Sequence, residues 1–355
     1  MRGRDLSGLK TAFGFRVVFA VGPVRILRAI TALAVVGMSA WWLSEHSWNV
    51  AKIGQDTWNY LAAGERLNAG HSIYKLTEGD RPIQFDPGST VALTSPPPVA
   101  VLWRPLALLP DWLAMWGWWT VSAAAMLATA MWVVLKGRWQ AVLLVFVLST
   151  AIGECAVSGN LDSFLAPAMV LSWWSVNAGR PRVAGLLTAV GAVLKIGPGA
   201  LLLWLLVRRE VSGVVAFVIG AVALGAISLV GAGLQQHLDF LSVARGSTDA
   251  AGWGASVPGL LGQLHTPAQV LELSIPAVWI LGVALMWILR DRPAAVFSIA
   301  VVLAVWGTPV VHLTAVGLLL AIAAPLTPAP GWMAPKGEPD PIPIRPEPGL
   351  AQGRG

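Results

Sequence analysis

The chain has 355 residues, of which 56% are hydrophobic and only 12% are charged, and its mean hydropathy is +0.68. This composition excludes a pair of ordinary soluble domains, because the recurrent apolar spans of about 18 or more residues fit only helices in a lipid bilayer. The net charge of +6 does not indicate nucleic acid binding, since the basic residues stand at span ends, as the positive-inside rule requires. The single cysteine, Cys155, excludes an internal disulfide and a cysteine-based metal site. The sequence therefore predicts one all-α polytopic membrane domain.

The N-terminal segment sets the expected orientation. Residues 1–25 are rich in arginine and lysine and contain one acid, Asp5, so they are expected in the cytoplasm. The first span, from about Ile26 to Leu43, then leads out of the membrane. It lacks the small-residue cleavage site of a secretory signal and is expected to remain as an anchor. Residues 44–98 form a long first outer loop.

The middle of the chain alternates across the membrane. The apolar stretch 99–109 is too short to cross, so it is expected to lie at the interface or to enter part-way. Spans 112–135, 139–157 and 161–176 then cross in turn. Their inner ends are marked by basic residues: Lys136, Arg138, Arg180 and Arg182.

Arginines flank the segment 183–207: Arg182 precedes it and Arg208 follows it. Both of its ends are therefore expected inside. Its middle reads GAVLKIGPG, in which a Gly-Pro-Gly break follows Lys195. Two half-helices that meet near the outer face at Lys195 satisfy both ends. A single long helix with a weak charge bias is the alternative.

The C-terminal part completes a domain over residues 26–326 with about 8–10 membrane helices, some short or re-entrant. Residues 327–355 are rich in proline and glycine and are expected to form a disordered cytoplasmic tail. The intervening segments are span 211–233, a second outer loop 234–269, and spans 270–289, 294–311 and 313–326. This topology brings Asp56, Glu154, Lys195 and His312 to one outward face.

Asp56 begins a polar motif in the first outer loop, and Tyr60 follows four residues later, on the same face of a helix. A carboxylate that is partly buried at a membrane interface can act as a general base. The alternative is that Asp56 only caps a juxtamembrane helix, and spacing alone favours that simpler role.

The other charged residues also have two interpretations. Lys195 stands in apolar sequence with no acid near it in the chain, so a phosphate is a plausible partner. His312 fits a packed core histidine and a functional group equally well. Glu154 and Asp162 flank a turn and are interpreted as a helix cap and a turn acid. Neither a nucleotide-binding loop nor a zinc motif is present, and no carboxylate cluster indicates a metal, so no cofactor is expected.

Read together, these segments resemble glycosyltransferase family 87, whose known members are polyprenyl-phosphate-mannose-dependent α-(1→2)-mannosyltransferases of the GT-C fold. The similarity runs from Asp56 to about Leu320. It is carried by Asp56 with Tyr60, Gly70 with Tyr74, Pro96-Pro97, Pro105 to Pro110, Gly159-Asn160, Gly179 to Pro198, Ser256 with Gly259, and Thr308-Pro309 with His312. The chain departs from the pattern at Leu93-Thr94-Ser95, Gly254-Ala255 and Val310-Val311.

The resemblance implies an inverting transfer of a hexose, mannose in the known members, from a polyprenyl-phosphate sugar donor to a lipid or glycan acceptor at the outer face of the plasma membrane. Asp56 would be the base, and Lys195 with His312 would meet the departing phosphate. Tyr60, Tyr74, Asn160 and Ser256 would bind substrate. The donor lipid is then a co-substrate, membrane lipids surround the protein, and nucleic acid is no partner. A transporter or lipid flippase, and a non-catalytic family member, remain as alternatives.

Overall fold

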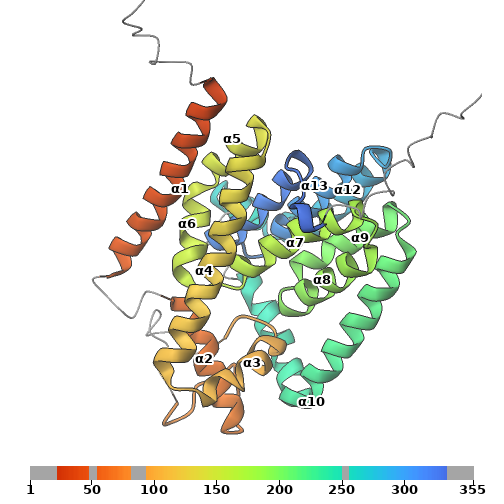
Figure 1. Ribbon diagram of the computed structural model, residues 1–355. Helices are drawn as coiled ribbons and strands as arrows, with labels where there is room; N and C mark the ends of the chain where they lie inside the picture. The colour runs from red at the N-terminus through yellow and green to blue at the C-terminus, as the bar shows by residue number, and fades with distance from the viewer. Residues whose placement is uncertain (1–21, 48–53, 81–92, 250–255, 334–355) are drawn as a thin grey trace, which may run out of the picture.

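The computed structural model describes residues 22–47, 54–80, 93–249 and 256–333, and in these ranges every regular element is a helix (Figure 1). The expectation of an all-α polytopic membrane protein is confirmed. In chain order from the N-terminus, the elements are α1 (Pro23–Ser47), α2 (Gln55–Asn68), α3 (Pro97–Trp103), η3 (Leu106–Leu108), α4 (Asp111–Lys136), α5 (Trp139–Val147) and α6 (Ser149–Ser158). They continue with α7 (Asp162–Asn177), α8 (Pro181–Leu194), η4 (Gly197–Ala200), α9 (Leu201–Val207), α10 (Val211–Asp249), α11 (Val257–Gln263), α12 (Ala268–Ile288), α13 (Pro293–Trp306), α14 (Leu313–Val316), η6 (Gly317–Leu326) and η7 (Gly331–Met333).

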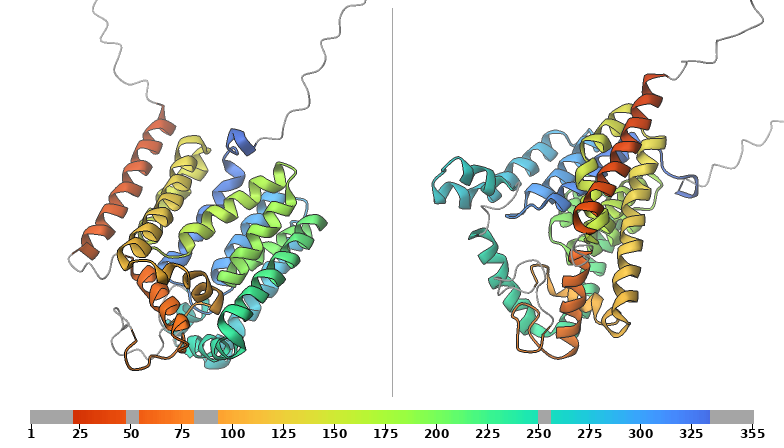
Figure 2. Two further views of the ribbon diagram at one scale, coloured as in Figure 1. Left: turned by 60° about the horizontal axis from the view of Figure 1, so that its bottom comes forward. Right: turned by 90° about the vertical axis from the view of Figure 1, so that its left-hand side faces the viewer.

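Four of the described helices are long and apolar enough to cross a membrane, and they lie in α1, α4, α10 and α12. The pair α5 and α6 forms a fifth span if its 60° bend at Leu148 is part of one crossing. Shorter apolar helices fill the interior: α8, η4 with α9, α13, and α14 with η6. Short helices of this kind can remain in a bilayer only where longer neighbours surround them. Helix α1 stands at the edge of the bundle (Figure 2).

The helix connections predicted to be cytoplasmic meet at one end of the bundle. Near the beginning of α1, the guanidinium of Arg28 donates to the carbonyl of Gly137, 3.1 Å away. The backbone N–H of Arg138 donates to the carbonyl of Leu326 at the end of η6. The indole of Trp174 donates to the carbonyl of Thr327. We call this region the basic end, and α2 and α3 lie at the opposite end (Figure 1).

The segment around Lys195 is a hairpin of two half-helices, as its flanking arginines predict. Helix α8 ends at Leu194, Lys195 is extended, and η4 begins two residues later. A Cβ at Gly213 of α10 would lie 2.9 Å from the carbonyl oxygen of Pro181 and 3.4 Å from Cδ2 of Leu205. The first residue of α8 and the last turns of α9 therefore flank the same residue of α10. The segment 181–207 therefore reverses direction at Lys195 and returns to the end of the bundle from which it started.

The structure corrects the boundary of the second outer loop. Helix α10 does not end at Gly233 but changes direction there, where the backbone has φ 80° and ψ 160°, and it continues to Asp249. The left-handed φ requires glycine at this position. The part beyond the kink packs on the first outer loop: the ring of Phe240 contacts Tyr74, and the Gln236 side chain accepts from the N–H of Ile73, 3.1 Å away.

The stretch predicted to lie at the interface forms α3 and η3. Helix α3 packs against α2 so closely that a Cβ at Gly64 would lie 2.7 Å from the carbonyl oxygen of Trp103. Arg104 then joins three elements. Its Nε donates to Asn68 at the end of α2, 2.9 Å away, and its Nη1 donates to the carbonyl of Gly231 in α10, 2.8 Å away.

The first residues of the predicted disordered tail have defined contacts. Residues 327–333 are packed: Thr327 and Met333 are buried, and the indole of Trp132 donates to the carbonyl of Pro328. The residues after Met333 lie outside the described part of the chain. The proline content alone did not reveal the tryptophan side chains that bind these first carbonyl groups.

The hairpin predicts that Ile196 and Arg182 face opposite sides of the membrane. The Ile196 side chain is 61% exposed, and Arg182 is also exposed. We expect a membrane-impermeant thiol reagent to label Ile196→Cys and Arg182→Cys from opposite sides in sealed vesicles, in a Cys155→Ser background. The serine preserves a donor for the carbonyl of Thr314 that Cys155 contacts.

Labelling of both cysteines from one side would show that the tip of the hairpin does not reach the side opposite Arg182. By the positive-inside rule, the side that labels Ile196 is expected to be the outer one.

Candidate active site

The candidate site forms where the beginning of α2 meets the turn between α6 and α7. The N–H of Gly54 donates to the carbonyl of Val157, 3.0 Å away, and fixes the start of α2. Gly159 ends α6 in the left-handed region, with φ 68°. A side chain at Gly159 would overlap Oγ1 of Thr57, so this glycine is required both by its backbone conformation and by the close approach of α2.

Two tryptophan side chains of α4 hold the same turn. The indole of Trp118 donates to the carbonyl of Gly159, and that of Trp119 donates to the carbonyl of Val157, each at 2.9 Å. Trp118 also packs on the ring of Tyr60. The carbonyl groups at the end of α6, which have no partner within their own helix, are thereby satisfied.

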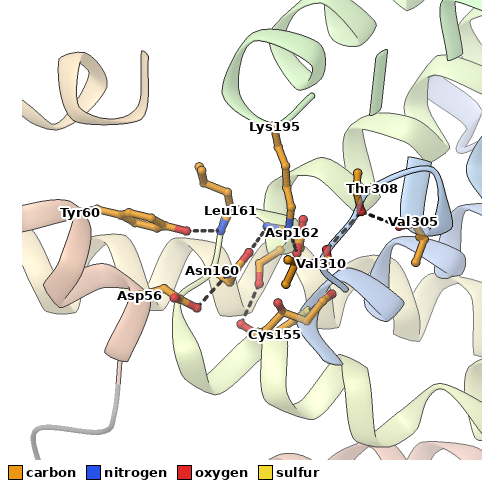
Figure 3. Close-up of polar contacts among 12 residues, drawn as sticks. Asp56, Tyr60, Cys155, Asn160, Leu161, Asp162, Lys195, Val305, Thr308 and Val310 are labelled. Carbon is orange, nitrogen blue, oxygen red and sulfur yellow. Dashed lines mark hydrogen bonds and ion pairs between the residues drawn. The ribbon is translucent and has the colours of Figure 1, made fainter. Parts of the chain in front are cut away.

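Asn160 connects Asp56 with the N-terminus of α7 (Figure 3). Its Nδ2 donates to Oδ2 of Asp56, and its Oδ1 accepts from the N–H of Asp162, both at 2.8 Å. The amide side chain caps α7 while it orients the Asp56 carboxylate. The position of Asp56 is therefore set by a residue 104 positions later in the chain.

Lys195 at the tip of the hairpin forms an ion pair with Asp162, with 2.5 Å between Nζ and Oδ2 (Figure 3). The Asp162 side chain is fully buried, whereas that of Lys195 is 35% exposed. Lys195 extends from the hairpin tip toward the beginning of α7. The lysine can therefore offer its other two N–H groups to a ligand, because Asp162 occupies only one.

The hairpin tip also lies against the end of α13. A Cβ at Gly197 would overlap the carbonyl oxygen of Ala304 and would lie 3.5 Å from Cγ2 of Thr308. The Thr308 hydroxyl contacts the carbonyl groups of Val305 and Val310 and so shapes the turn that leads to His312 (Figure 3). This packing brings His312 into electrostatic contact with Lys195, Asp56 and Asp162.

The electrostatics of the site depend first on burial. Burial raises the pKa of Asp56, although the hydrogen bond from Asn160 and the charge of Lys195 act in the opposite direction. Partial burial, followed by the charge of Lys195, lowers the pKa of His312. His312 is therefore a neutral imidazole at pH 7 and provides one N–H donor and one acceptor.

The structure brings together five of the seven site residues predicted from the sequence. Asp56, Asn160, Lys195 and His312 form the electrostatic cluster, and the hydroxyl of Tyr60 accepts from the N–H of Leu161 in the same turn, 3.5 Å away. The Tyr60 ring packs against both Trp103 and Trp118, which also contact each other. Tyr60 therefore helps to hold the turn between α6 and α7 in place.

Tyr74 and Ser256 have other contacts. The Tyr74 hydroxyl donates to the carbonyl of Ser95, 3.0 Å away, and its ring packs on Phe240. Ser256 caps α11 by accepting from the N–H of Gly259, 3.0 Å away, and is fully buried. Both contacts are those of residues that shape the outer segments, and substrate binding by these two side chains stays a prediction.

Two acids acquire a different role from the one expected. The sequence near Lys195 contains no acid, which made a phosphate its expected partner, but the fold brings Asp162 to it from 33 positions away. Asp162 is therefore more than a turn acid, and Glu154 interacts electrostatically with Asp56 and Asp162. A signal was present in the sequence: the expected topology placed Lys195 and the 158–162 turn at the same end, and a buried lysine requires an anion.

The described residues contain no group of three or more His, Cys, Asp or Glu side chains that could hold a metal ion. The candidate site is thus a cluster of ionisable side chains, Asp56, Asp162, Lys195 and His312, within a membrane helix bundle. The sequence matches the model of glycosyltransferase family 87 over residues 94–324.

The chain therefore belongs to glycosyltransferase family 87 and is a membrane glycosyltransferase. No curated protein and no solved structure matches it significantly. The matched range contains Asn160, Asp162, Lys195 and His312, and Asp56 is connected to it through Asn160.

Gly159 provides a test of how α2 is placed. In Gly159→Ala, the left-handed conformation costs about 1–2 kcal/mol, and the overlap with Thr57 adds to it. We expect a lower Tm and a large loss of transfer activity. Thr57→Ala should restore part of both in the double variant, because it removes the overlapping oxygen while the backbone strain remains.

Gly225→Ala is the matched control, since a Cβ there meets nothing within 4 Å. An unchanged Tm and activity in Gly159→Ala, or a double variant no better than the single one, would contradict this account of the turn.

Proposed function

We propose that the protein transfers a hexose, specifically mannose, from a polyprenyl-phosphate donor to a lipid or glycan acceptor at the outer face of the plasma membrane. The observation that carries the proposal is the connection of Asp56 to the Lys195 ion pair through Asn160 and Asp162. It provides a base and a phosphate-binding cation in one rigid unit. The GT-C fold and the inverting course of the reaction are part of the proposal.

The reaction needs a proton acceptor on one side of the anomeric carbon. In the proposed step, the ionised Asp56 carboxylate takes the proton from the acceptor hydroxyl while that oxygen forms a bond to the anomeric carbon. The bond from the anomeric carbon to the phosphate oxygen breaks on the opposite face, and the phosphate leaves with the electron pair. Raising the basicity of Asp56 by burial makes it a stronger proton acceptor near neutral pH.

The leaving monophosphate gains charge, and fixed donors must stabilise it. Lys195 supplies a positive charge in a partly apolar setting, where electrostatic stabilisation is stronger than in water. Neutral His312 donates one N–H. Asp162 remains paired with Lys195 from the buried side, so the lysine keeps its direction whether or not a phosphate is bound.

The orientation follows from charge. The connections at the basic end contain arginine and lysine residues, which favours a cytoplasmic location for that end. The cluster around Asp56 is then outside, where no nucleotide-sugar is available and a lipid-linked donor is required. The gathering of charges at one end, rather than in paired sites at mid-membrane, favours an enzyme over a transporter.

Asp56→Asn tests the base. We expect a loss of transfer of at least ~100-fold with no loss of thermal stability. Asparagine keeps an oxygen for the Asn160 amide and carries no charge. Because burial raises the pKa of Asp56, its charged form destabilises the fold at neutral pH, and this cost disappears as the pH falls through the raised pKa. The neutral variant should therefore unfold at the same or a higher temperature at pH 7.

In the wild-type enzyme the rate should fall on the acid side as Asp56 is protonated. Asp291→Asn, an exposed acid at the basic end, is the control. Near-normal turnover of Asp56→Asn would exclude Asp56 as the base.

Lys195→Ala tests phosphate binding. A charge-assisted hydrogen bond is worth roughly 1.5–3 kcal/mol, so donor affinity should fall about 10- to 100-fold. The acceptor KM should change little. The measurement is donor binding and acceptor kinetics in nanodiscs, with the exposed Lys136→Ala as control.

The double variant Lys195→Ala/Asp162→Asn separates binding from folding. It should recover thermal stability, because no unpaired buried carboxylate remains, while donor affinity stays weak. If Lys195→Ala instead keeps donor affinity and weakens the acceptor, Lys195 does not bind the phosphate.

A further inference from the structure

Two carboxylate oxygens of the site are buried without a hydrogen-bond partner: Oε2 of Glu154 and Oδ1 of Asp162. A buried carboxylate oxygen without a donor destabilises a fold. Unsatisfied groups of this kind in native proteins have a specific cause, of which a role in binding or catalysis is one.

The two acids differ in what they can reach. Asp162 has no exposed surface, and its other oxygen is held by Lys195. Glu154 is only partly buried. The ionisable groups that act on it are Asp56 and Asp162, both of which are acids. Glu154 therefore has hydrogen-bonding capacity that no described cation satisfies, on the side where Asp56 works.

The backbone on both sides of Glu154 is fixed. Gly153 lies against α1, where a Cβ would be 3.0 Å from the carbonyl carbon of Met38. The carbonyl of Cys155 accepts from the hydroxyl of Ser163, 2.8 Å away, and its thiol donates to the carbonyl of Thr314, 3.1 Å away. The backbone position of Glu154 is thus set by α1, α7 and α14.

We propose that Glu154 is a substrate-binding residue that accepts a hydrogen bond from a sugar hydroxyl next to the reacting centre. The inference rests on the proposed function and names a specificity determinant within the same site. A hydroxyl is the group that fits, because it donates to a carboxylate oxygen without adding charge to a cluster already rich in carboxylates; the partly exposed Glu154 side chain has to turn to bring Oε2 to it. The sugar can belong to the donor or to the acceptor, and the experiment distinguishes the two.

The experiment compares wild type, Glu154→Gln and Glu154→Ala in nanodiscs, with polyprenyl-phosphate mannose and its monodeoxy analogues as donors and with monodeoxy acceptors. We expect removal of one hydroxyl to reduce the wild-type kcat/KM about 10- to 100-fold. The same analogue should reduce the kcat/KM of Glu154→Ala no more than about 3-fold, since the partner of that hydroxyl is already gone. The substrate in which this analogue occurs, donor or acceptor, identifies the sugar.

A stability measurement separates binding from a structural role. Glu154→Gln has nearly the same shape and lacks the charge, so it should raise Tm while it lowers kcat/KM. Glu272→Gln, an exposed acid of α12, should change neither.

Three results would overturn the proposal: full activity of Glu154→Ala, an unchanged penalty for every deoxy analogue in that variant, or a lower Tm in Glu154→Gln. Absence of transfer by the wild type from any polyprenyl-phosphate sugar would refute the proposed function instead. In that case the Tm of Glu154→Gln still decides whether the carboxylate is retained at a cost to the fold.

Discussion

The ion pair between Lys195 and Asp162 is the interaction on which the site depends. It joins the tip of the α8–α9 hairpin to the first residue of α7. Removing one member of a buried pair costs about 3–5 kcal/mol, because it leaves a charge without a partner. The cost falls unequally here: the partly exposed ammonium can turn to water, whereas the carboxylate cannot. Asp162 therefore determines the position of the Lys195 ammonium group. Removing the lysine would leave the buried carboxylate unpaired and destabilise the fold.

The remaining polar contacts follow from this pair. Asn160 caps α7 and thereby stands beside Asp56, so the helix that presents Asp162 also sets the direction of Asp56. The tip of the hairpin packs on the end of α13 and so places the turn before His312. Asp56, Lys195 and His312 come from segments far apart in the chain, yet each is positioned by the beginning of α7 or by the hairpin.

The sequence predicted the all-α architecture, the break at Lys195 and the convergence of Asp56, Lys195 and His312, because span length and charge asymmetry are local properties. It did not predict that Lys195 pairs with Asp162, since helix rotation and depth decide which side chains meet. The predicted end of the span at Gly233 is wrong for a related reason. A glycine followed by polar residues indicates the end of a span, but the packing of Phe240 and Gln236 on the first outer segment keeps the next turns helical. The family resemblance assigns Tyr74 and Ser256 to substrate binding, but their hydroxyl groups form hydrogen bonds with backbone groups.

Arg104 has a consequence for how freely α2 can move. Through this side chain the far end of α2 is joined both to α3 and to α10, while Asn160 holds the near end at Asp56. Hydrogen bonds therefore hold α2 at both of its ends. A movement of α2 away from the α6–α7 turn would have to break the hydrogen bonds of Arg104 and of Asn160 together, so these contacts favour a fixed position of Asp56 over closure of α2 around a bound molecule.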